Sequence, residues 1–224
     1  MNHTLIEWTM YTWNVIVGCL VGCPFCYARR QARRFKHRCS KCYCFEPHFH
    51  AERLDEPLKV KKPSKIFVCS MGEPFGPWVP REWTEAILDV VRRCPQHIFQ
   101  FLTKCPAGAK GYAFPPNCWI GTSVDRSAAL GRIDILREVA APLRFVSFEP
   151  LLGPMVDLDL RGIDWVIVGA QTGPGAAKPD ARWVEGIIAA CRQESVPVFL
   201  KNNLRWPERI QEWPTATTQG MVTG

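Results

Sequence analysis

Seven short apolar runs, rich in Val, Ile and Phe, restrict the fold of this chain more than any other feature. Most lack the strict alternation of a half-buried strand, which is typical of parallel strands covered on both faces. They occupy residues 13–18, 65–70, 97–103, 118–124, 144–149, 164–170 and 196–201. Helical periodicity predicts helices between some of these runs, over residues 81–94, 127–140 and 180–194, and Asp180 is the expected N-cap of the last helix.

Strands that alternate with helices predict parallel βαβ units and an α/β fold. Seven such strands favour a partial (β/α)6-7 TIM-like barrel over a doubly wound open sheet. The chain has 224 residues, 47% of them hydrophobic, so we expect one domain over residues 1–224. Residues 37–63 break the alternation, and we interpret them as a small Cys/His-rich insertion.

Polar residues follow the predicted strands at the points where the apolar runs stop. In β/α barrels these positions form one rim, where active sites lie. We therefore expect the side chains that follow the strands to face one mouth. They are Cys19, Glu73, Lys104, Ser123, Asp125, Glu149, Gln171, Lys201 and Asn202.

The segment "GCLVGCPFCYARR" at residues 18–30 holds three of the eleven cysteines, with the spacing Cys-x3-Cys-x2-Cys. No secretion signal precedes it, so clustered cysteines indicate metal or redox chemistry rather than disulfides. Three ligands are one short of a structural zinc site, which takes four. A [4Fe-4S] cluster also takes four, and three cysteines would leave one iron open to another ligand. Gly18 and Gly22 permit the tight turns of such a loop.

With an aromatic residue before its last cysteine, this loop resembles the signature loop of the radical S-adenosylmethionine (SAM) superfamily. The resemblance implies a partial barrel in which Cys19, Cys23 and Cys26 hold a [4Fe-4S] cluster and SAM binds the fourth iron. One electron would cleave SAM to methionine and a 5′-deoxyadenosyl radical, which abstracts a substrate hydrogen.

A narrower resemblance covers nearly the whole chain. Segments such as "IEWTMYTWNVIVGC", "KKPSKIFVCSMGEPFGPWVP" and "FVSFEPLLGPM" look like small radical SAM proteins first described as phage proteins of unknown function. "CPFCYA" is also similar to the cysteine loop of spore photoproduct lyase, a DNA-repair enzyme of the superfamily, which favours a nucleic-acid substrate.

The resemblance also assigns expected cofactor contacts. "MGEPF" is similar to the Gly-Gly-Glu type motif that binds the SAM amino group, with Met71 in place of the first glycine. The expected cofactor-binding residues are Tyr27 beside the cluster, Gly72 and Glu73 at the amino group, Ser123 and Asp125 at the ribose, and Glu149 at SAM or substrate.

A second group of ligand-type residues lies in the insertion. Cys39, Cys42 and Cys44, together with His48 and His50, can supply a zinc site, an auxiliary iron–sulfur cluster or no metal site at all. Two further cysteines, Cys69 and Cys105, follow predicted strands. Either is a candidate donor of a hydrogen atom to a substrate radical, although small buried hydrophobic residues are the more common role of scattered cysteines.

The positive charge of the chain lies beside its cysteines. Residues 1–65 contain 12 Lys/Arg and 5 Asp/Glu, whereas the rest of the chain is balanced. A local basic patch suits a polyanion, and we expect nucleic acid to contact it. The residues concerned are Arg29, Arg30, Arg33, Arg34, Lys36 and Arg38.

Three functions remain open on these grounds. The first is a radical SAM enzyme that repairs or modifies nucleic acid. The second is a radical SAM enzyme acting on a peptide or small metabolite, with the basic patch recruiting an electron donor such as flavodoxin or ferredoxin. The third is a non-catalytic, metal-stapled nucleic-acid-binding module. The chain shows neither a signal peptide nor an apolar stretch of membrane-spanning length, so we expect a cytoplasmic location.

Overall fold

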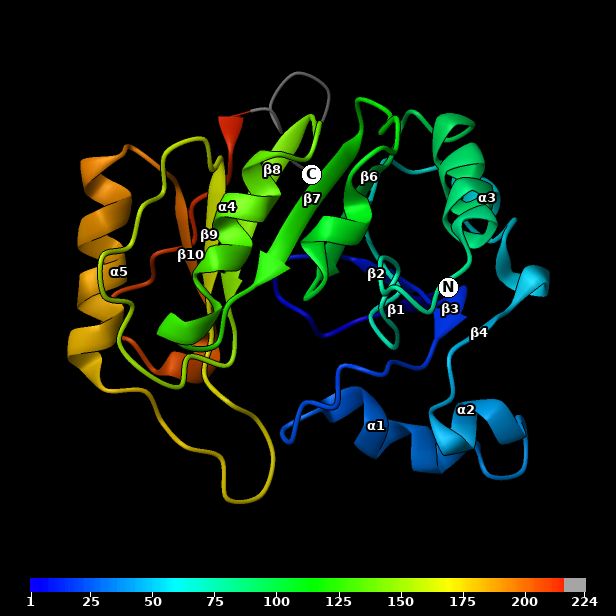
Figure 1. The fold of residues 1–224 in the computed structure, drawn as a ribbon, viewed down its shortest axis with the longest axis horizontal. Coiled ribbons are helices and arrows are strands. Elements are labelled where there is room, and N and C mark those ends of the chain that lie inside the picture. The colour runs from blue at the N-terminus through cyan, green and yellow to red at the C-terminus, as the bar shows by residue number, and fades with distance from the viewer. Residues whose placement is uncertain (216–224) are drawn as a thin grey trace. The chain divides into compact units, whose positions relative to one another are not determined.

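The computed structural model describes residues 1–215 as a mixed α/β fold (Figure 1). Eight strands of the described residues form one mostly parallel sheet in the order β1-β2-β5-β6-β7-β8-β9-β10. They are β1 (Asn2–His3), β2 (Tyr11–Trp13), β5 (Lys65–Val68), β6 (Ile98–Thr103), β7 (Cys118–Ser123), β8 (Leu143–Phe148), β9 (Trp165–Val168) and β10 (Val198–Leu200). The α/β prediction is confirmed, and the sheet is not closed; its curvature into a partial barrel stays a prediction.

The chain divides into two compact units, which we describe separately. Unit 1 comprises Met1–Ile120 with Val139–Pro142, and unit 2 comprises Gly121–Glu138 with Leu143–Gly224.

Within unit 1, β1 pairs antiparallel with β2, while β2, β5 and β6 run parallel. Helix α3 (Arg81–Arg92) connects β5 to β6, as predicted for a βαβ unit. Its buried side chains recur at helical spacing, as Ile87, Leu88 and Val91 show.

Unit 2 repeats this arrangement. β8, β9 and β10 run parallel, and α5 (Ala181–Gln193) connects β9 to β10. The predicted cap is confirmed, because the Asp180 side chain accepts a hydrogen bond of 2.9 Å from the Arg182 N–H. Residues 127–140, predicted as one helix, contain a 3-10 turn (Ser127–Ala129) and the shorter helix α4 (Gly131–Arg137), which packs against β8.

The first predicted strand, residues 13–18, is divided by Asn14. β2 ends at Trp13, and Ile16–Val17 (β3) instead pairs antiparallel with His48–Phe49 (β4) in a separate two-stranded sheet. The Asn14 Oδ1 accepts hydrogen bonds from the Met71 N–H at 2.9 Å and the Ser70 hydroxyl at 3.1 Å. These bonds hold the backbone turn at which the chain leaves the main sheet.

Two further α-helices lie in residues 27–44. Helices α1 (Tyr27–Ala32) and α2 (Ser40–Cys44) pack against each other beside β3 and β4 (Figure 1). The predicted insertion, residues 37–63, thus contains α2, β4 and two 3-10 turns, Ala51–Arg53 and Pro57–Lys59. No helix of the described residues is both long and apolar enough to cross a membrane.

Candidate metal centres

Two glycines clamp the start of the three-cysteine loop to the segment after β5. The Gly18 N–H donates to the Met71 carbonyl at 2.9 Å, and Gly18 and Gly72 form a parallel bridge. A Cβ atom on Gly72 would lie 2.4 Å from the carbonyl oxygen of Ile16. Gly18 has a φ of +94°, and its Cβ would lie 2.3 Å from the Glu46 carbonyl oxygen. Both positions therefore require glycine.

Replacing Gly72 with alanine should destabilise the protein by about 1–3 kcal/mol or more, because backbone atoms must move to admit the methyl group. Gly186→Ala is a matched control: Gly186 is exposed in α5, and a Cβ there meets nothing within 4 Å. That variant should gain about 0.5–1 kcal/mol from helix propensity. Denaturant unfolding measures both, and equal effects of the two substitutions would contradict the clamp.

Two of the three loop cysteines, Cys19 and Cys26, pack against the same buried cluster, and Cys23 is half-buried. The Cys19 sulfur accepts a hydrogen bond from the Val21 N–H at 3.4 Å. Cys26 is the N-cap of α1, and its sulfur accepts from the Arg29 N–H at 3.3 Å. Burial, with smaller contributions from Glu73, Cys23 and Cys26, raises the pKa of the Cys19 thiol to about 11. A cation that binds these sulfurs would reverse this shift, because it stabilises thiolates.

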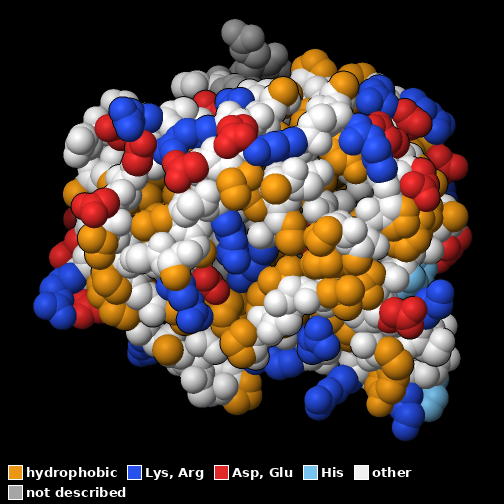
Figure 2. Space-filling model, in the orientation of Figure 1, with side chains coloured by type: hydrophobic (Ala, Val, Ile, Leu, Met, Phe, Trp, Pro, Cys, Tyr) orange, Lys and Arg blue, Asp and Glu red, His pale blue; other side chains and the backbone are white. Residues whose placement is uncertain are grey.

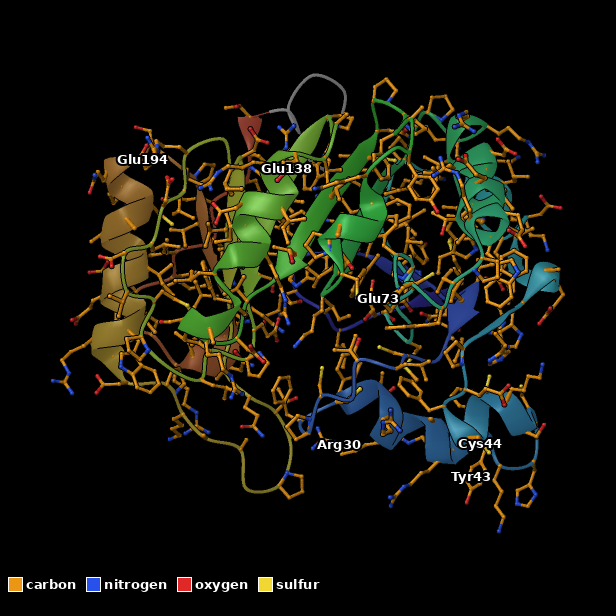
Figure 3. All side chains as sticks on the ribbon, in the orientation of Figure 1. Arg30, Tyr43, Cys44, Glu73, Glu138 and Glu194 are labelled. Carbon is orange, nitrogen blue, oxygen red and sulfur yellow. The ribbon has the colours of Figure 1, made fainter. Side chains whose placement is uncertain are left out.

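A buried carboxylate lies beside this loop. Glu73 is 4% exposed, and it accepts hydrogen bonds from the Thr103 hydroxyl, the Lys104 N–H at 2.9 Å and the Phe75 N–H at 3.3 Å. Figure 3 shows it inside unit 1, whereas Arg30 projects from α1. Burial raises the pKa of Glu73 despite these three donors. Burial therefore outweighs both these hydrogen bonds and the nearby positive charge of Lys104.

The raised pKa of Glu73 predicts how the stability of the protein depends on pH. Because the native state binds this proton more tightly than the unfolded chain, stability should fall as pH rises from about 4.3 through the native pKa. Glu73→Gln does not titrate, so the free energy of unfolding of the wild type relative to this variant should fall between pH 4 and 8. Its expected size is about 1.4 kcal/mol per unit of pKa shift. Urea unfolding across that pH range measures the difference in stability between the two proteins. A difference that does not change with pH would contradict a raised pKa of Glu73.

The other candidates of unit 1 have different environments. The Tyr27 hydroxyl donates to the Ser70 carbonyl at 2.5 Å, which ties the start of α1 to the segment after β5. Cys69 is 1% exposed with a left-handed backbone, and burial raises the pKa of its thiol to about 12. Cys105 is half-buried, and the Lys104 ammonium lies 4.7 Å from the centre of the Phe25 ring. Of the two candidate hydrogen donors, Cys105 is thus the more accessible.

Three candidates belong to unit 2. Ser123 and Asp125 are both buried, and the Ser123 carbonyl accepts a hydrogen bond from Arg132 at 2.8 Å. Glu149 forms an ion pair with Lys201, and a Cβ on Gly169 would lie 2.9 Å from the Glu149 carboxyl carbon. Gly169 therefore leaves room for this pair at the ends of β8, β9 and β10. The convergence of these residues with the cysteine loop on one mouth stays a prediction.

A second centre lies between α2 and β4. One ligand atom from each of Cys39, Cys42, His48 and His50 lies within 4.8 Å of the other three. The Cys42 sulfur is 3.3 Å from the His48 Nε2 and 3.2 Å from the His50 Nε2, and the two Nε2 atoms are 2.8 Å apart. The Cys39 sulfur is 3.6 Å from the His48 Nε2. Such a Cys2His2 cluster can bind a metal ion such as zinc.

Cys44, the fifth predicted ligand, lies outside this cluster. It is exposed at the end of α2, beside the exposed Tyr43 (Figure 3). On a helix, residues three or four apart lie on the same face, whereas residues two apart do not. Cys44 follows Cys42 by two residues and therefore points away from the face of Cys42.

Sequence reasoning did not identify Asn14 and Thr103 as site residues. Asn14 binds the segment before Gly72, and Thr103 binds Glu73 directly. The available signal was the position of Thr103 at the end of a predicted strand, in the segment "FLTK".

The basic segment remains exposed. Lys and Arg side chains gather over α1 and the residues that follow it (Figure 2). Arg29 differs from the others because it donates to the Cys19 carbonyl at 3.3 Å and lies 5.1 Å from the centre of the Phe45 ring. Arg33, Arg34, Lys36 and Arg38 are exposed.

The described residues form an α/β fold whose first unit contains the three-cysteine loop and a Cys2His2 cluster. The chain matches, over residues 3–221, the model of the family described as "Protein of unknown function (DUF5131)", and it belongs to that family. Neither a curated protein nor a solved structure matches it.

Proposed function

We propose that this protein is a radical SAM enzyme with a partial-barrel fold, and that it acts on nucleic acid. One observation carries the proposal. Three cysteines lie within eight residues directly after the Gly18–Gly72 bridge, none of them in the Cys2His2 cluster, and the buried Glu73 is close enough to Cys19 to raise the pKa of its thiol.

The donor set fits a [4Fe-4S] cluster with one open iron. Cys19, Cys23 and Cys26 supply three thiolates, and soft thiolate sulfur is the ligand that iron–sulfur clusters take. Bound there with SAM, the cluster would supply the electron that cleaves SAM to methionine and a 5′-deoxyadenosyl radical, which takes a hydrogen atom from the substrate.

The chain itself would bind and orient SAM. A buried carboxylate with a raised pKa gains from a cationic partner, so Glu73 is suited to the SAM amino group. The clamp at Gly72 fixes the backbone next to Glu73, and Tyr27 holds the first turn of α1 to the same segment. From the resemblance we further expect Ser123 and Asp125 to bind the ribose and Glu149 to bind SAM or substrate.

The substrate class rests on charge. The exposed basic residues of α1 and the following turn begin directly after the three-cysteine loop, and acidic side chains do not occur between residues 8 and 45. A phosphate backbone would thus be held beside the proposed cluster. In the alternative, a peptide or small metabolite is the substrate and the same patch binds an acidic flavodoxin or ferredoxin.

Anaerobic purification and reconstitution of the full chain test the proposal. We expect about four iron atoms and matching sulfide per chain, a brown colour that dithionite bleaches, and formation of 5′-deoxyadenosine from SAM. Mass spectrometry of 5′-deoxyadenosine formed with deuterium-labelled DNA or RNA then identifies the substrate class by deuterium transfer. A colourless protein without SAM cleavage would leave the non-catalytic, metal-stapled nucleic-acid-binding module.

A further inference from the structure

Hydrogen bonding fixes the tautomers of the two histidines in the Cys2His2 cluster. The His48 Nδ1 lies 2.7 Å from the Glu46 carbonyl oxygen, and the His50 Nδ1 lies 2.6 Å from the Glu52 carboxylate. Both partners accept hydrogen bonds, so each Nδ1 carries a proton. In neutral imidazoles the two Nε2 atoms are then bare acceptors, and they face each other at 2.8 Å. Two facing lone pairs repel unless a cation lies between them.

The spacing of the ligand atoms fits one tetrahedral zinc ion. Bonds of about 2.3 Å to sulfur and about 2.0–2.1 Å to nitrogen place tetrahedral ligand atoms about 3.3–3.8 Å apart. The four contacts between sulfur and nitrogen or between nitrogens span 2.8–3.6 Å, and binding of an ion requires only a small expansion. The outer hydrogen bonds to Glu46 and Glu52 are those that orient metal-bound histidines. A single ion therefore suits this cluster better than a four-iron cube, whose ligands each bind a different iron.

The cluster joins the insertion to the three-cysteine loop through the backbone. The His50 N–H donates to the Val15 carbonyl at 2.8 Å, and β4 pairs with β3, which leads directly into Gly18. The Glu46 carbonyl, which accepts from His48, is also the group that a Cβ on Gly18 would strike.

Side-chain packing makes the same connection. Cys42 belongs to a buried cluster with Val17, Ala28, Phe45 and Met71, and Ala32 completes it. Cys19, Cys26 and Cys39 pack against this group from outside. The α1–α2 layer is small and its two helices have six and five residues, so its own core provides little stability.

We propose that Cys39, Cys42, His48 and His50 bind one structural zinc ion, and that this ion holds the three-cysteine loop in place. Binding removes the protons of both thiols and leaves the histidines neutral, so the bound site is Zn²⁺ with two thiolates and two imidazoles and has no net charge. The zinc ion would lie in residues 39–50, against which residues 18–30 pack. It takes no part in the reaction. The zinc site itself does not rest on the proposed function.

Metal analysis of the full-length protein tests the site. We expect about one zinc per chain, and cobalt added to chelator-treated protein should give the visible absorption of a tetrahedral site with sulfur ligands. Cys42→Ser should lose the zinc, whereas Cys44→Ser, a change in the exposed cysteine of the same helix, should keep it. Cys23→Ala should keep the zinc while losing iron. Equal zinc loss in Cys42→Ser and Cys44→Ser would overturn the zinc assignment. Iron bound at the Cys2His2 cluster in Cys23→Ala would overturn it as well.

Hydrogen exchange tests the effect on the loop. Removal of zinc from the wild-type protein should accelerate exchange of the backbone amides in residues 18–30 at least about tenfold, and zinc should reverse the change. Amides of α5 in unit 2 should be unaffected. Because this comparison uses one wild-type chain, it does not depend on whether Cys42→Ser folds. Unchanged exchange in residues 18–30 would refute the supporting role, while absence of SAM cleavage from a zinc-loaded protein would refute only the proposed function.

Discussion

Cys23→Ala is expected to abolish both iron binding at the loop and SAM cleavage. Loss of an outer hydrogen-bond partner of a metal ligand costs about 10–100-fold, and loss of a ligand itself should cost at least about 100-fold in 5′-deoxyadenosine formation. Cys23 is half-buried, and its carbonyl accepts the N–H of Cys26 at 3.2 Å, a bond that alanine retains. The loop backbone should therefore survive the substitution. Iron content, dithionite-sensitive absorption and product formation measure the loss.

Cys44→Ala is the matched control for this experiment. Cys44 is exposed, and it belongs neither to the loop nor to the Cys2His2 cluster. Its iron content and SAM cleavage should equal those of the wild type. The radical SAM proposal fails if Cys23→Ala keeps its colour and its activity.

Neutralising three basic residues beside the loop should have the second large effect. The triple variant Arg33→Ala, Arg34→Ala, Lys36→Ala removes three exposed charges while leaving Arg29, which contacts the loop, unchanged. If each contacts a phosphate, the slope of log affinity against log salt concentration should decrease by about 2.7 for duplex DNA. Fluorescence anisotropy across a salt series measures this slope, and affinity at low salt should fall steeply.

A second triple variant separates a local contact from an effect of net charge. Arg161→Ala, Arg182→Ala, Arg209→Ala removes the same number of charges from unit 2, where Arg161 and Arg182 pair with neighbouring carboxylates. Its salt slope should match that of the wild type. Equal slopes for the two triple variants would contradict a nucleic-acid contact at α1, and a weakened interaction with flavodoxin alone would favour the alternative substrate classes.

Apolar patterning was sufficient to predict most of the sheet. Six of the seven apolar runs, from residues 65–70 to 196–201, correspond to β5 to β10 within a few residues. Buried parallel strands are encoded by local hydrophobicity, and α3 and α5 by a helical period that a single sequence displays. The cap at Asp180 was predictable because its geometry depends on residues two apart.

The parts of the fold that the sequence did not reveal depend on distant partners. The division of the first strand follows from Asn14, whose side chain binds residues 70 and 71. β3 and β4 have two residues each, too few for a period to be visible. Five ligand-type residues in the insertion were recognisable by type. The exclusion of Cys44 required the fold, because it depends on residues 40–44 being helical, which turns Cys44 away from the face of Cys42.

The Glu46 carbonyl gives the insertion a consequence for protein engineering. This oxygen accepts a hydrogen bond from the His48 Nδ1–H, and it lies so close to Gly18 that a Cβ there would be 2.3 Å from it. Adding or deleting one residue near it would shift the histidines and the three-cysteine loop together. Residues 37–63 thus cannot be deleted without affecting the rest of unit 1. Their deletion would remove β4, the strand that pairs with β3, and the residues that pack against the three-cysteine loop. Fusion sites and affinity tags therefore belong elsewhere, and we expect a point change at the exposed Tyr43 of α2 to be tolerated better than a change of length there.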